Sequence, residues 1–238
     1  MALQDNLTSY WKLDGNSNDS VGTNTGTDTA ITYSTTSGKI NSGASFNGST
    51  SKIGLPNGSA PTGGNARSIS MWFNSSTTQQ DQLFGYGVVA AQQAFVIFTN
   101  MNGQIGKLGL NCNNGDFLTT NVVFTNDSSW VHLVVTYAGG GLTNSNVLMY
   151  VNGVLEATNN PAAATANTSN SNFAIGFDSV YAASLHLTGA VDEVAVWSRA
   201  ITPQEVQVLY RGGRGLQYPF GNLFTETRQM FSTNWKQG

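Results

Sequence analysis

The sequence Leu187-Thr-Gly-Ala-Val-Asp-Glu-Val-Ala-Val-Trp-Ser-Arg-Ala-Ile-Thr-Pro-Gln-Glu-Val-Gln-Val-Leu-Tyr210 joins a strand signal to a helix signal. Residues 190–197 alternate in character, which predicts a half-buried strand. Thr202 as N-cap, Pro203 at the first helical position and Glu205 at the third form a capping box, and Gly212-Gly213 provides an end signal. The stretch therefore predicts a strand that leads directly into one short helix.

The rest of the chain reads as short strands separated by turn residues. Strong strand signals lie at 68–73, 94–98 and 130–137, and Asn152-Gly153 predicts a type I′ hairpin between two apolar runs. Asn47-Gly48 predicts a second hairpin, between 44–46 and 52–55. About a dozen short strands at this spacing favour a two-sheet sandwich, because an open sheet would leave long edges exposed.

Composition limits the classes of partner and compartment. The 238 residues suit one large domain, and a net charge of −3 gives no electrostatic reason to expect nucleic acid or an anionic membrane as a partner. The N-terminal residues show neither a basic region nor an apolar run, so we expect no secretory signal and no membrane span.

Cys112 is the single cysteine, which excludes an intrachain disulfide. We expect it to be a small residue in a strand rather than a reactive thiol.

Six motifs follow one another in the order of a known family. They are Tyr10-Trp-Lys-Leu-Asp-Gly15, Gly43-Ala-Ser-Phe-Asn-Gly48, Ile69-Ser-Met-Trp72, Trp130-Val-His-Leu-Val-Val-Thr-Tyr137, Met149-Tyr-Val-Asn-Gly153 and Gly189-Ala-Val-Asp-Glu-Val194. In this series the chain resembles the laminin-G-like jelly roll family, in its concanavalin-A-like branch. The resemblance implies an all-β, two-sheet antiparallel jelly roll with one short C-terminal helix over residues 1–214, followed by a tail over 215–238. Family members bind glycans or proteins, form part of surface proteins or accompany enzymes, so the fold selects no activity.

Catalysis by a glycoside hydrolase needs two cooperating carboxylates. None of the four glutamates has an acidic residue two positions away. Asp192 and Glu193 are adjacent, so on a regular strand they point to opposite faces and cannot cooperate. For His132 we expect packing rather than catalysis. We therefore predict no catalytic residue, and a hydrolase is the least favoured function.

A metal site is a separate question. Asp14-Gly-Asn-Ser-Asn-Asp19 crowds oxygen ligands, but an EF-hand calcium loop requires Gly and Glu where Asp19 and Thr25 stand. The family resemblance implies a different site, one structural Ca²⁺ bound where Asp14 or Asp19 meets Asp192. The alternative is that Asp14 and Asp19 are turn residues that accept local backbone hydrogen bonds, and that Asp192 is a hydrogen-bonded strand end.

A glycan site combines an aromatic platform with amides and carboxylates, because sugars present both C–H faces and hydroxyls. The tryptophans at the family motifs are assigned to the core, so we looked for aromatic and polar residues in the loops, where function tends to collect. The candidate ligand-binding residues are Tyr86, Asn113, Asp116, Phe117, Asp178 and Tyr181. The alternative is that these are the amide-rich loops of any soluble jelly roll.

The segment 215–238 lies outside the family motifs and carries more large apolar side chains than a free tail should. We predict that it docks, either on its own domain or on another chain, which would be a virion protein or a second protomer. The candidate partner-binding residues are Tyr218, Phe220, Phe224, Phe231 and Trp235.

Three functions remain, in order of preference. The first is a non-catalytic virion surface or structural protein, for capsid decoration or association with the tail, whose jelly roll binds host or environmental glycans. The opening residues 3–14 resemble the start of jelly roll proteins common in phage genomes, and this supports a virion location. The second is a bacterial lectin-like adhesion module at the cell surface or outside the cell. The third is the disfavoured hydrolase.

Overall fold

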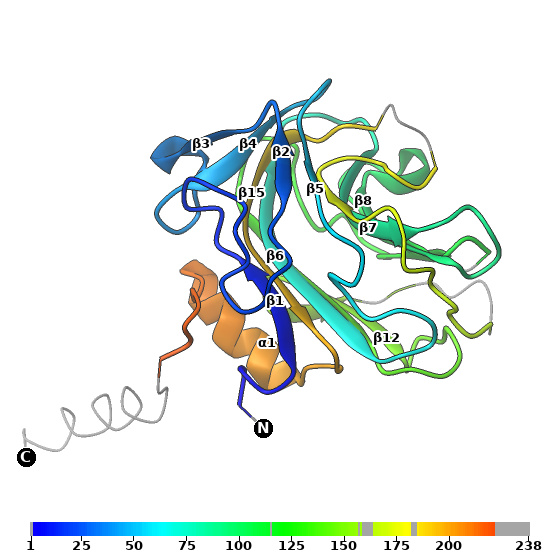
Figure 1. The fold of residues 1–238 in the computed structure, drawn as a ribbon. Coiled ribbons are helices and arrows are strands. Elements are labelled where there is room, and N and C mark those ends of the chain that lie inside the picture. Colours follow the sequence, from blue (N-terminus) through cyan, green and yellow to red (C-terminus); the bar gives the residue numbers. More distant parts are fainter. Residues whose placement is uncertain (1, 115, 157, 159–163, 182–184, 222–238) are drawn as a thin grey trace, which may run out of the picture.

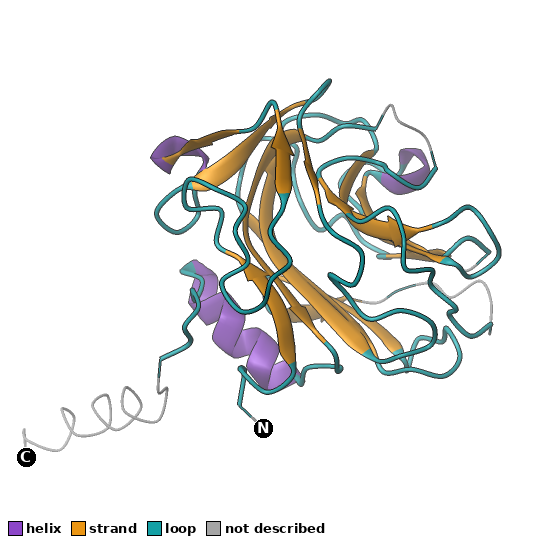
Figure 2. Ribbon diagram, in the orientation of Figure 1, coloured by secondary structure: helices purple, strands orange, loops and turns teal. Residues whose placement is uncertain are grey.

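The structure is a sandwich of two antiparallel sheets (Figures 1 and 2). It is a computed structural model that describes residues 2–114, 116–156, 158, 164–181 and 185–221. The predicted all-β jelly roll with one short C-terminal helix is confirmed.

Within these residues the larger sheet has the order β13-β12-β11-β6-β15-β4-β3, and β1 also pairs with β15. Its strands are β1 (Leu7–Trp11), β3 (Thr32–Ser34), β4 (Gly43–Asn47), β6 (Arg67–Ser75), β11 (Val131–Tyr137), β12 (Val147–Val151), β13 (Val154–Glu156) and β15 (Thr188–Trp197). The smaller sheet has the order β10-β9-β8-β7-β14-β5-β2. Its strands are β2 (Thr27–Thr29), β5 (Lys52–Gly54), β7 (Asp81–Gly87), β8 (Ala94–Thr99), β9 (Leu108–Asn111), β10 (Asp116–Leu118) and β14 (Ala174–Ile175).

The predicted closing unit has the expected local structure. β15 leads into α1 (Pro203–Tyr210), whose capping box is formed by Thr202 and Glu205. The other helical elements described are short 3₁₀ turns, η1 (Thr35–Ser37), η2 (Met101–Gly103) and η3 (Arg211–Gly213). Across the described ranges, none of these helices has the length and apolar character needed to cross a membrane.

The two predicted hairpins have different outcomes. Asn152 and Gly153 both have positive φ and join β12 to β13, so that hairpin is confirmed. The hairpin predicted at Asn47-Gly48 is wrong, because β4 belongs to the larger sheet and β5 to the smaller one. The side-chain oxygen of Asn47 accepts backbone N–H groups from residues 49–51, and this turn carries the chain from one sheet to the other.

The main core fills the space between the sheets. It contains Trp11, Cys112, Tyr86 and Phe117, all with no exposed surface. The prediction that Tyr86 and Phe117 are loop aromatics that bind a ligand is therefore wrong. They belong to strands β7 and β10, and their side chains point into the sandwich.

A second apolar cluster covers the outer face of the larger sheet. Figure 1 shows α1 there, next to β1. The cluster includes Tyr10 and Trp197 from the sheet, Val206 from α1 and Phe220 from beyond the helix. The indole N–H of Trp197 donates to the carbonyl of Leu3 over 2.7 Å, which ties the N-terminal residues to the same face.

Arg67, the first residue of β6, lies in the core with no exposed surface. Its guanidinium donates to the carbonyls of Gly63 (2.6 Å) and Asn65 (3.0 Å) and to the hydroxyls of Tyr86 (2.6 Å) and Thr168 (3.0 Å). The rings of Tyr86, Phe95 and Tyr137 lie 5.2–5.9 Å from it. No carboxylate is among its partners in the described residues, so oxygen dipoles and aromatic faces compensate this buried charge.

We predict that Arg67→Lys lowers the free energy of unfolding by about 3 kcal/mol, because one ammonium cannot reach acceptors in two loops and its charge stays buried. Urea denaturation measures this effect. Arg214→Lys, at an exposed position, is the matched control and should leave stability unchanged. An Arg67→Lys protein as stable as the parent would contradict the role given to the guanidinium.

Candidate functional site

Two of the predicted ligand-binding residues meet at one end of the smaller sheet. The side-chain oxygen of Asn111, the last residue of β9, accepts the hydroxyl of Tyr181 over 2.6 Å and the backbone N–H of Asn113 over 2.7 Å. The Tyr181 ring is half-buried and lies 6.3 Å from the ring of Phe98. We call this group of Asn111, Asn113 and Tyr181 the tyrosine ledge.

Asp178 fixes the backbone of the ledge. Its carboxylate accepts the N–H groups of Val180 (3.0 Å) and Tyr181 (2.8 Å), and it is 1% exposed. Asp178 therefore supports the ledge from beneath and does not present its carboxylate to solvent. Asp116 pairs with Asn111 in the β9–β10 register, which places its backbone beside the ledge.

Backbone hydrogen bonds connect the ledge to the loop before β6. The N–H of Gln92 donates to the carbonyl of Asn113, and the carbonyl of Gln92 accepts the N–H of Asn167. Thr168 then pairs with Gly63 in both directions. Segments that are distant in sequence thus form one continuous rim at this end of the sandwich.

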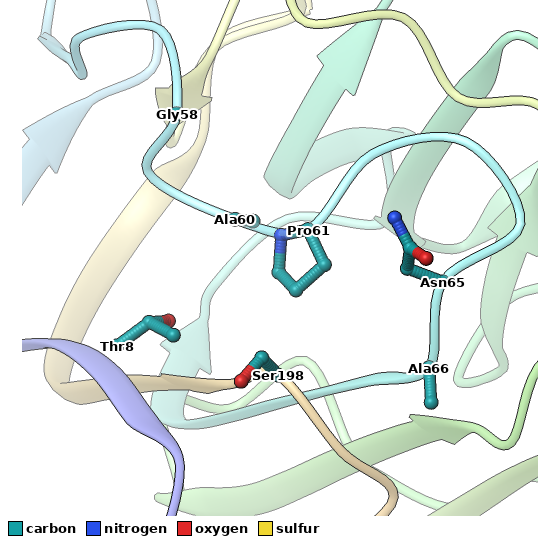
Figure 3. A pocket seen from close by; sticks show the side chains of 7 residues that line it. All are labelled: Thr8, Gly58, Ala60, Pro61, Asn65, Ala66 and Ser198. Atoms are coloured by element: carbon teal, nitrogen blue, oxygen red, sulfur yellow. The ribbon is translucent and has the colours of Figure 1, made fainter.

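At the other end of this rim there is a hollow of about 430 Å³. Its lining is drawn from β1, from residues 58–66 and from the residue after β15. The lining residues are Thr8, Gly58, Ala60, Pro61, Asn65, Ala66 and Ser198. In Figure 3 Thr8 and Ser198 lie on one side, Asn65 and Ala66 on the other, and the Pro61 ring stands between them. We call this space the rim hollow.

The residues of the rim hollow carry no signal in the sequence. Thr8, Pro61, Asn65 and Ser198 come from three separate parts of the chain, and each is an ordinary turn or strand-end residue by itself. Asn111 was also missed, because it lies at a strand end and not in the adjacent loop that we searched.

His132 is buried, as the sequence analysis expected. It is 2% exposed, and its Nε2 lies 3.0 Å from the hydroxyl of Ser70. Burial lowers the pKa of His132 to about 3. The ring is therefore neutral at physiological pH and is out of contact with solvent, which suits packing beside Trp72 rather than proton transfer.

Asp14, Asp192 and Glu193 form an acidic cluster beneath the segment after α1. Glu193 has φ of +54° at a bulge in β15, so its side chain does not alternate with that of Asp192. The expectation that these two carboxyl groups lie on opposite faces is therefore wrong. The Gln217 amide nitrogen donates to Glu193 over 2.6 Å and to Asp14 over 2.8 Å, and so bridges them.

The two buried carboxyl groups of this cluster titrate far from their ordinary range. Burial, and secondly the charge of Asp192, raises the pKa of Glu193 to about 8. Burial also raises the pKa of Asp192 to about 7, although the N–H groups of Ile40 and Lys39 oppose the shift. The hydroxyl of Tyr10 completes the cluster by a short hydrogen bond to Glu193.

This cluster does not fit a calcium ion. The oxygens of Asp192 accept three backbone N–H groups, and those of Asp14 accept the N–H of Ser42 and the Gln217 amide. Asp19 shares none of these hydrogen bonds, and its carboxylate accepts the N–H groups of residues 10, 21 and 24. In the described part of the chain, no three His, Cys, Asp or Glu residues are arranged to hold a metal. The geometry favours the alternative, in which these aspartates accept backbone hydrogen bonds.

Two of the predicted partner-binding residues pack on their own domain. Phe220 is 4% exposed and lies against Tyr10 and Trp197, and the Tyr218 ring lies 5.5 Å from that of Tyr10. For Phe220 the structure therefore favours the alternative of docking on its own domain, and a partner contact is wrong because the side chain is covered. Tyr218 is half-buried, so a partner contact stays a prediction for this residue. Phe224, Phe231 and Trp235 lie outside the described residues.

Comparison with known proteins supports the fold. A profile of the concanavalin A-like lectin/glucanases superfamily matches residues 46–207. No curated protein sequence matches the chain. Domain 4 of AbnA, a GH43 extracellular arabinanase from Geobacillus stearothermophilus solved with arabinotriose, is similar with a TM-score of 0.67 and 22% identity, over 88% of this chain and 98% of that one.

Two further structures are similar over most of this chain. The binding domain of Paraclostridial Mosquitocidal Protein 1 has a TM-score of 0.67 and 15% identity, over 88% of this chain and 52% of that one. The Trypanosoma rangeli sialidase has a TM-score of 0.65 and 14% identity, over 89% of this chain and 34% of that one. At these identities the likeness shows a shared fold, and this chain spans about half of the first protein and a third of the second.

We predict that calcium does not stabilise the protein, because amide and backbone donors already bind the oxygens of the acidic cluster. The melting temperature should be the same with millimolar CaCl₂ and with EDTA. An ion present at a hundredfold excess over its Kd would add about 2.7 kcal/mol of stability. A lower melting temperature in EDTA, absent in an Asp192→Asn variant, would restore the calcium site.

Stability should fall as pH rises from about 5 to 8. The folded-state pKa values of Asp192 and Glu193 lie above their unfolded values, so their contribution is full below about pH 4 and is lost through pH 7–8. Glu193→Gln removes one of the two groups and should reduce the loss by up to about 4 kcal/mol, which is about 1.4 kcal/mol for each of the roughly three pH units between pH 5 and the pKa of Glu193. Urea unfolding at several pH values gives the dependence of the free energy of unfolding on pH for parent and variant. The same dependence in both proteins would contradict the prediction.

Proposed function

This chain belongs to the concanavalin A-like lectin/glucanases superfamily, and we propose that it is a non-catalytic carbohydrate-binding domain. Its binding surface is the rim that runs from the tyrosine ledge to the rim hollow. The observation that carries the proposal is the hydrogen bond of 2.6 Å that joins the half-buried Tyr181 to Asn111, because it holds an aromatic ring beside amide groups.

The ledge has the chemistry that a sugar requires. An aromatic ring provides an apolar face for sugar C–H groups, and its hydroxyl keeps a polar end at the water boundary. The amide of Asn113 has both a donor and an acceptor for sugar hydroxyls. Loops fixed on a rigid sheet are the usual place for such contacts.

The comparisons add support at the level of the fold. An arabinanase domain of the same fold is described in complex with arabinotriose, and it matches nearly its whole length to this chain. We therefore include arabinotriose among the oligosaccharides to be tested. That arabinanase is described as extracellular, which is compatible with a module that works outside the cell or at its surface.

A non-catalytic role is supported by the position of the acids. A glycosidase needs two carboxyl groups at 5–9.5 Å that face the substrate. Asp192 and Glu193 are at most 4% exposed and lie under the segment after α1, where a glycan has no access. The residues that line the rim hollow include no carboxylate.

Attachment to a virion is a further part of the proposal and rests on the sequence. The lectin-like adhesion module is its alternative, and the two differ in location rather than in binding chemistry. Phe220 no longer supports attachment, since it is buried on its own domain, whereas the half-buried Tyr218 stays a predicted contact. Phe224, Phe231 and Trp235 remain as the predicted contacts with virion proteins or with a second protomer.

We expect Tyr181→Ala to lower affinity for the bound glycan at least tenfold, because it removes the apolar face of the ledge, whereas Tyr181→Phe keeps the ring and should lose less. Isothermal titration with arabinotriose, cellotriose and maltotriose measures this effect. Tyr33→Ala, at the edge of the other sheet, is the control. Absence of binding to a broad glycan array by the parent would sink the proposed function.

A further inference from the structure

We infer that the rim hollow is a binding subsite for one uncharged sugar unit. This inference rests on the proposed function and deepens it, since it names a second contact region and the charge class of the glycan. It uses residues that are separate from the tyrosine ledge.

The size of the hollow suits such a ligand. About 430 Å³ lies in the range of small-molecule sites, which runs from about 300 to 1,000 Å³. The space is a shallow depression that is widely open to solvent, and Ser198, Asn65 and Gly58 are exposed at its border. A single sugar ring within a longer chain can therefore enter it without a change in the fold.

The polar groups of the hollow match sugar hydroxyls. Thr8 Oγ1 donates to the carbonyl of Val196 over 2.9 Å and keeps its acceptor capacity. One amide hydrogen of Asn65 is used by the carbonyl of Thr62, which leaves the other hydrogen and the amide oxygen for a ligand. Ser198 adds a hydroxyl whose only described partner is a carbonyl at 3.4 Å. Donors and acceptors thus stand on both sides of the Pro61 ring, as Figure 3 shows.

The floor of the hollow is apolar. The Pro61 ring and the methyl groups of Ala60 and Ala66 are its non-polar parts (Figure 3). Such a surface can cover the C–H face of a sugar ring, while the hydroxyl and amide groups at the border bind its edges. The combination is the one expected for a polyhydroxylated ring rather than for a purely apolar ligand.

No charged side chain lines the hollow among the residues described. Two arginines adjoin the lining residues in sequence, and both are engaged elsewhere. Arg67 has no exposed surface and donates to Gly63, Asn65, Tyr86 and Thr168. Arg199 is 8% exposed, pairs with Glu205 and donates to the carbonyls of Ala2 and Asp5. A carboxylate-bearing sugar would therefore lose water at this site and gain no cationic partner. This is the reason for assigning an uncharged unit.

The hollow is also rigid before any ligand binds. Arg67 holds the carbonyls of Gly63 and Asn65, and the hydroxyl of Tyr86 donates to the carbonyl of Pro61 over 2.6 Å. Three successive points of the loop are thus tied to the core. A wall that is ordered in advance loses little conformational entropy on binding, which is how small polar sites reach useful affinity.

The test fills the hollow and compares the result with a matched surface change. Ser198→Trp places a large side chain in the hollow from an exposed position. Ser129→Trp is the control, because it adds the same side chain at an exposed turn before β11 that does not line the hollow. Titration of the full chain with arabinotriose, cellotriose and maltotriose should show about a tenfold loss for Ser198→Trp and none for Ser129→Trp. Asn65→Ala should lose affinity severalfold. Trigalacturonate, an anionic probe of equal length, should bind at least tenfold more weakly than the best neutral trisaccharide.

The outcomes separate this inference from the proposed function. If Tyr181→Ala abolishes binding and Ser198→Trp has parental affinity and parental melting temperature, the rim hollow is not a subsite but the domain still binds glycans. If trigalacturonate binds as tightly as the neutral probes, the assignment of an uncharged unit is overturned. If Ser198→Trp folds poorly, NMR titration of the parent with the trisaccharides replaces this variant. A shift of the Asn65 side-chain amide resonance supports the inference, and an unchanged resonance overturns it. If the parent binds no glycan, both proposals fail.

Discussion

The buried guanidinium of Arg67 is the constraint on which this end of the molecule depends. Removing a charge from water costs several kcal/mol unless hydrogen bonds and favourable electrostatics replace the lost hydration. Here the replacement comes from both sheets and from two loops, since Tyr86 and Phe95 belong to the smaller sheet and Tyr137 to the larger one. The loop at 61–65 and the segment around Thr168 must be in place to satisfy the charge. The need to bind the buried guanidinium therefore fixes the conformation of the loop at 61–65, which forms part of the rim hollow.

The parts of the fold that the sequence predicts well are those determined locally. The capping box of Thr202 and Glu205 and the positive-φ turn at Asn152-Gly153 need only neighbouring residues, and both are present. Asn47-Gly48 carries an equally strong turn signal, but the partner of each flanking strand is chosen by tertiary packing. The bulge at Glu193 is also invisible in the sequence. The prediction that Asp192 and Glu193 face opposite ways assumed a regular strand, and a single residue with φ of +54° breaks that alternation.

In the candidate site, too, residue types are visible in the sequence, whereas contacts made by tertiary packing are not. Tyr181 and Asn113 stand out by residue type, and the structure brings them together through Asn111. Tyr86 and Phe117 have the same composition signal but belong to core strands, since an aromatic residue near a turn does not reveal on which side of the strand it lies. The rim hollow has no signal at all in the sequence, because strands β1 and β15 and the loop before β6 meet only in the folded chain.

The position of β15 has a consequence for how the chain is made. This strand is the last one among the described residues, yet it pairs with β6, β4 and β1, whose residues are synthesised long before it. While the chain emerges from the ribosome, the larger sheet has a gap at its middle, and the edges of β6 and β4 wait for a partner more than a hundred residues away. Such non-local pairing slows folding and leaves apolar strand edges accessible to other nascent chains. Yield in a living cell should therefore depend on translation speed and chaperone supply more than the equilibrium stability of the finished domain would suggest.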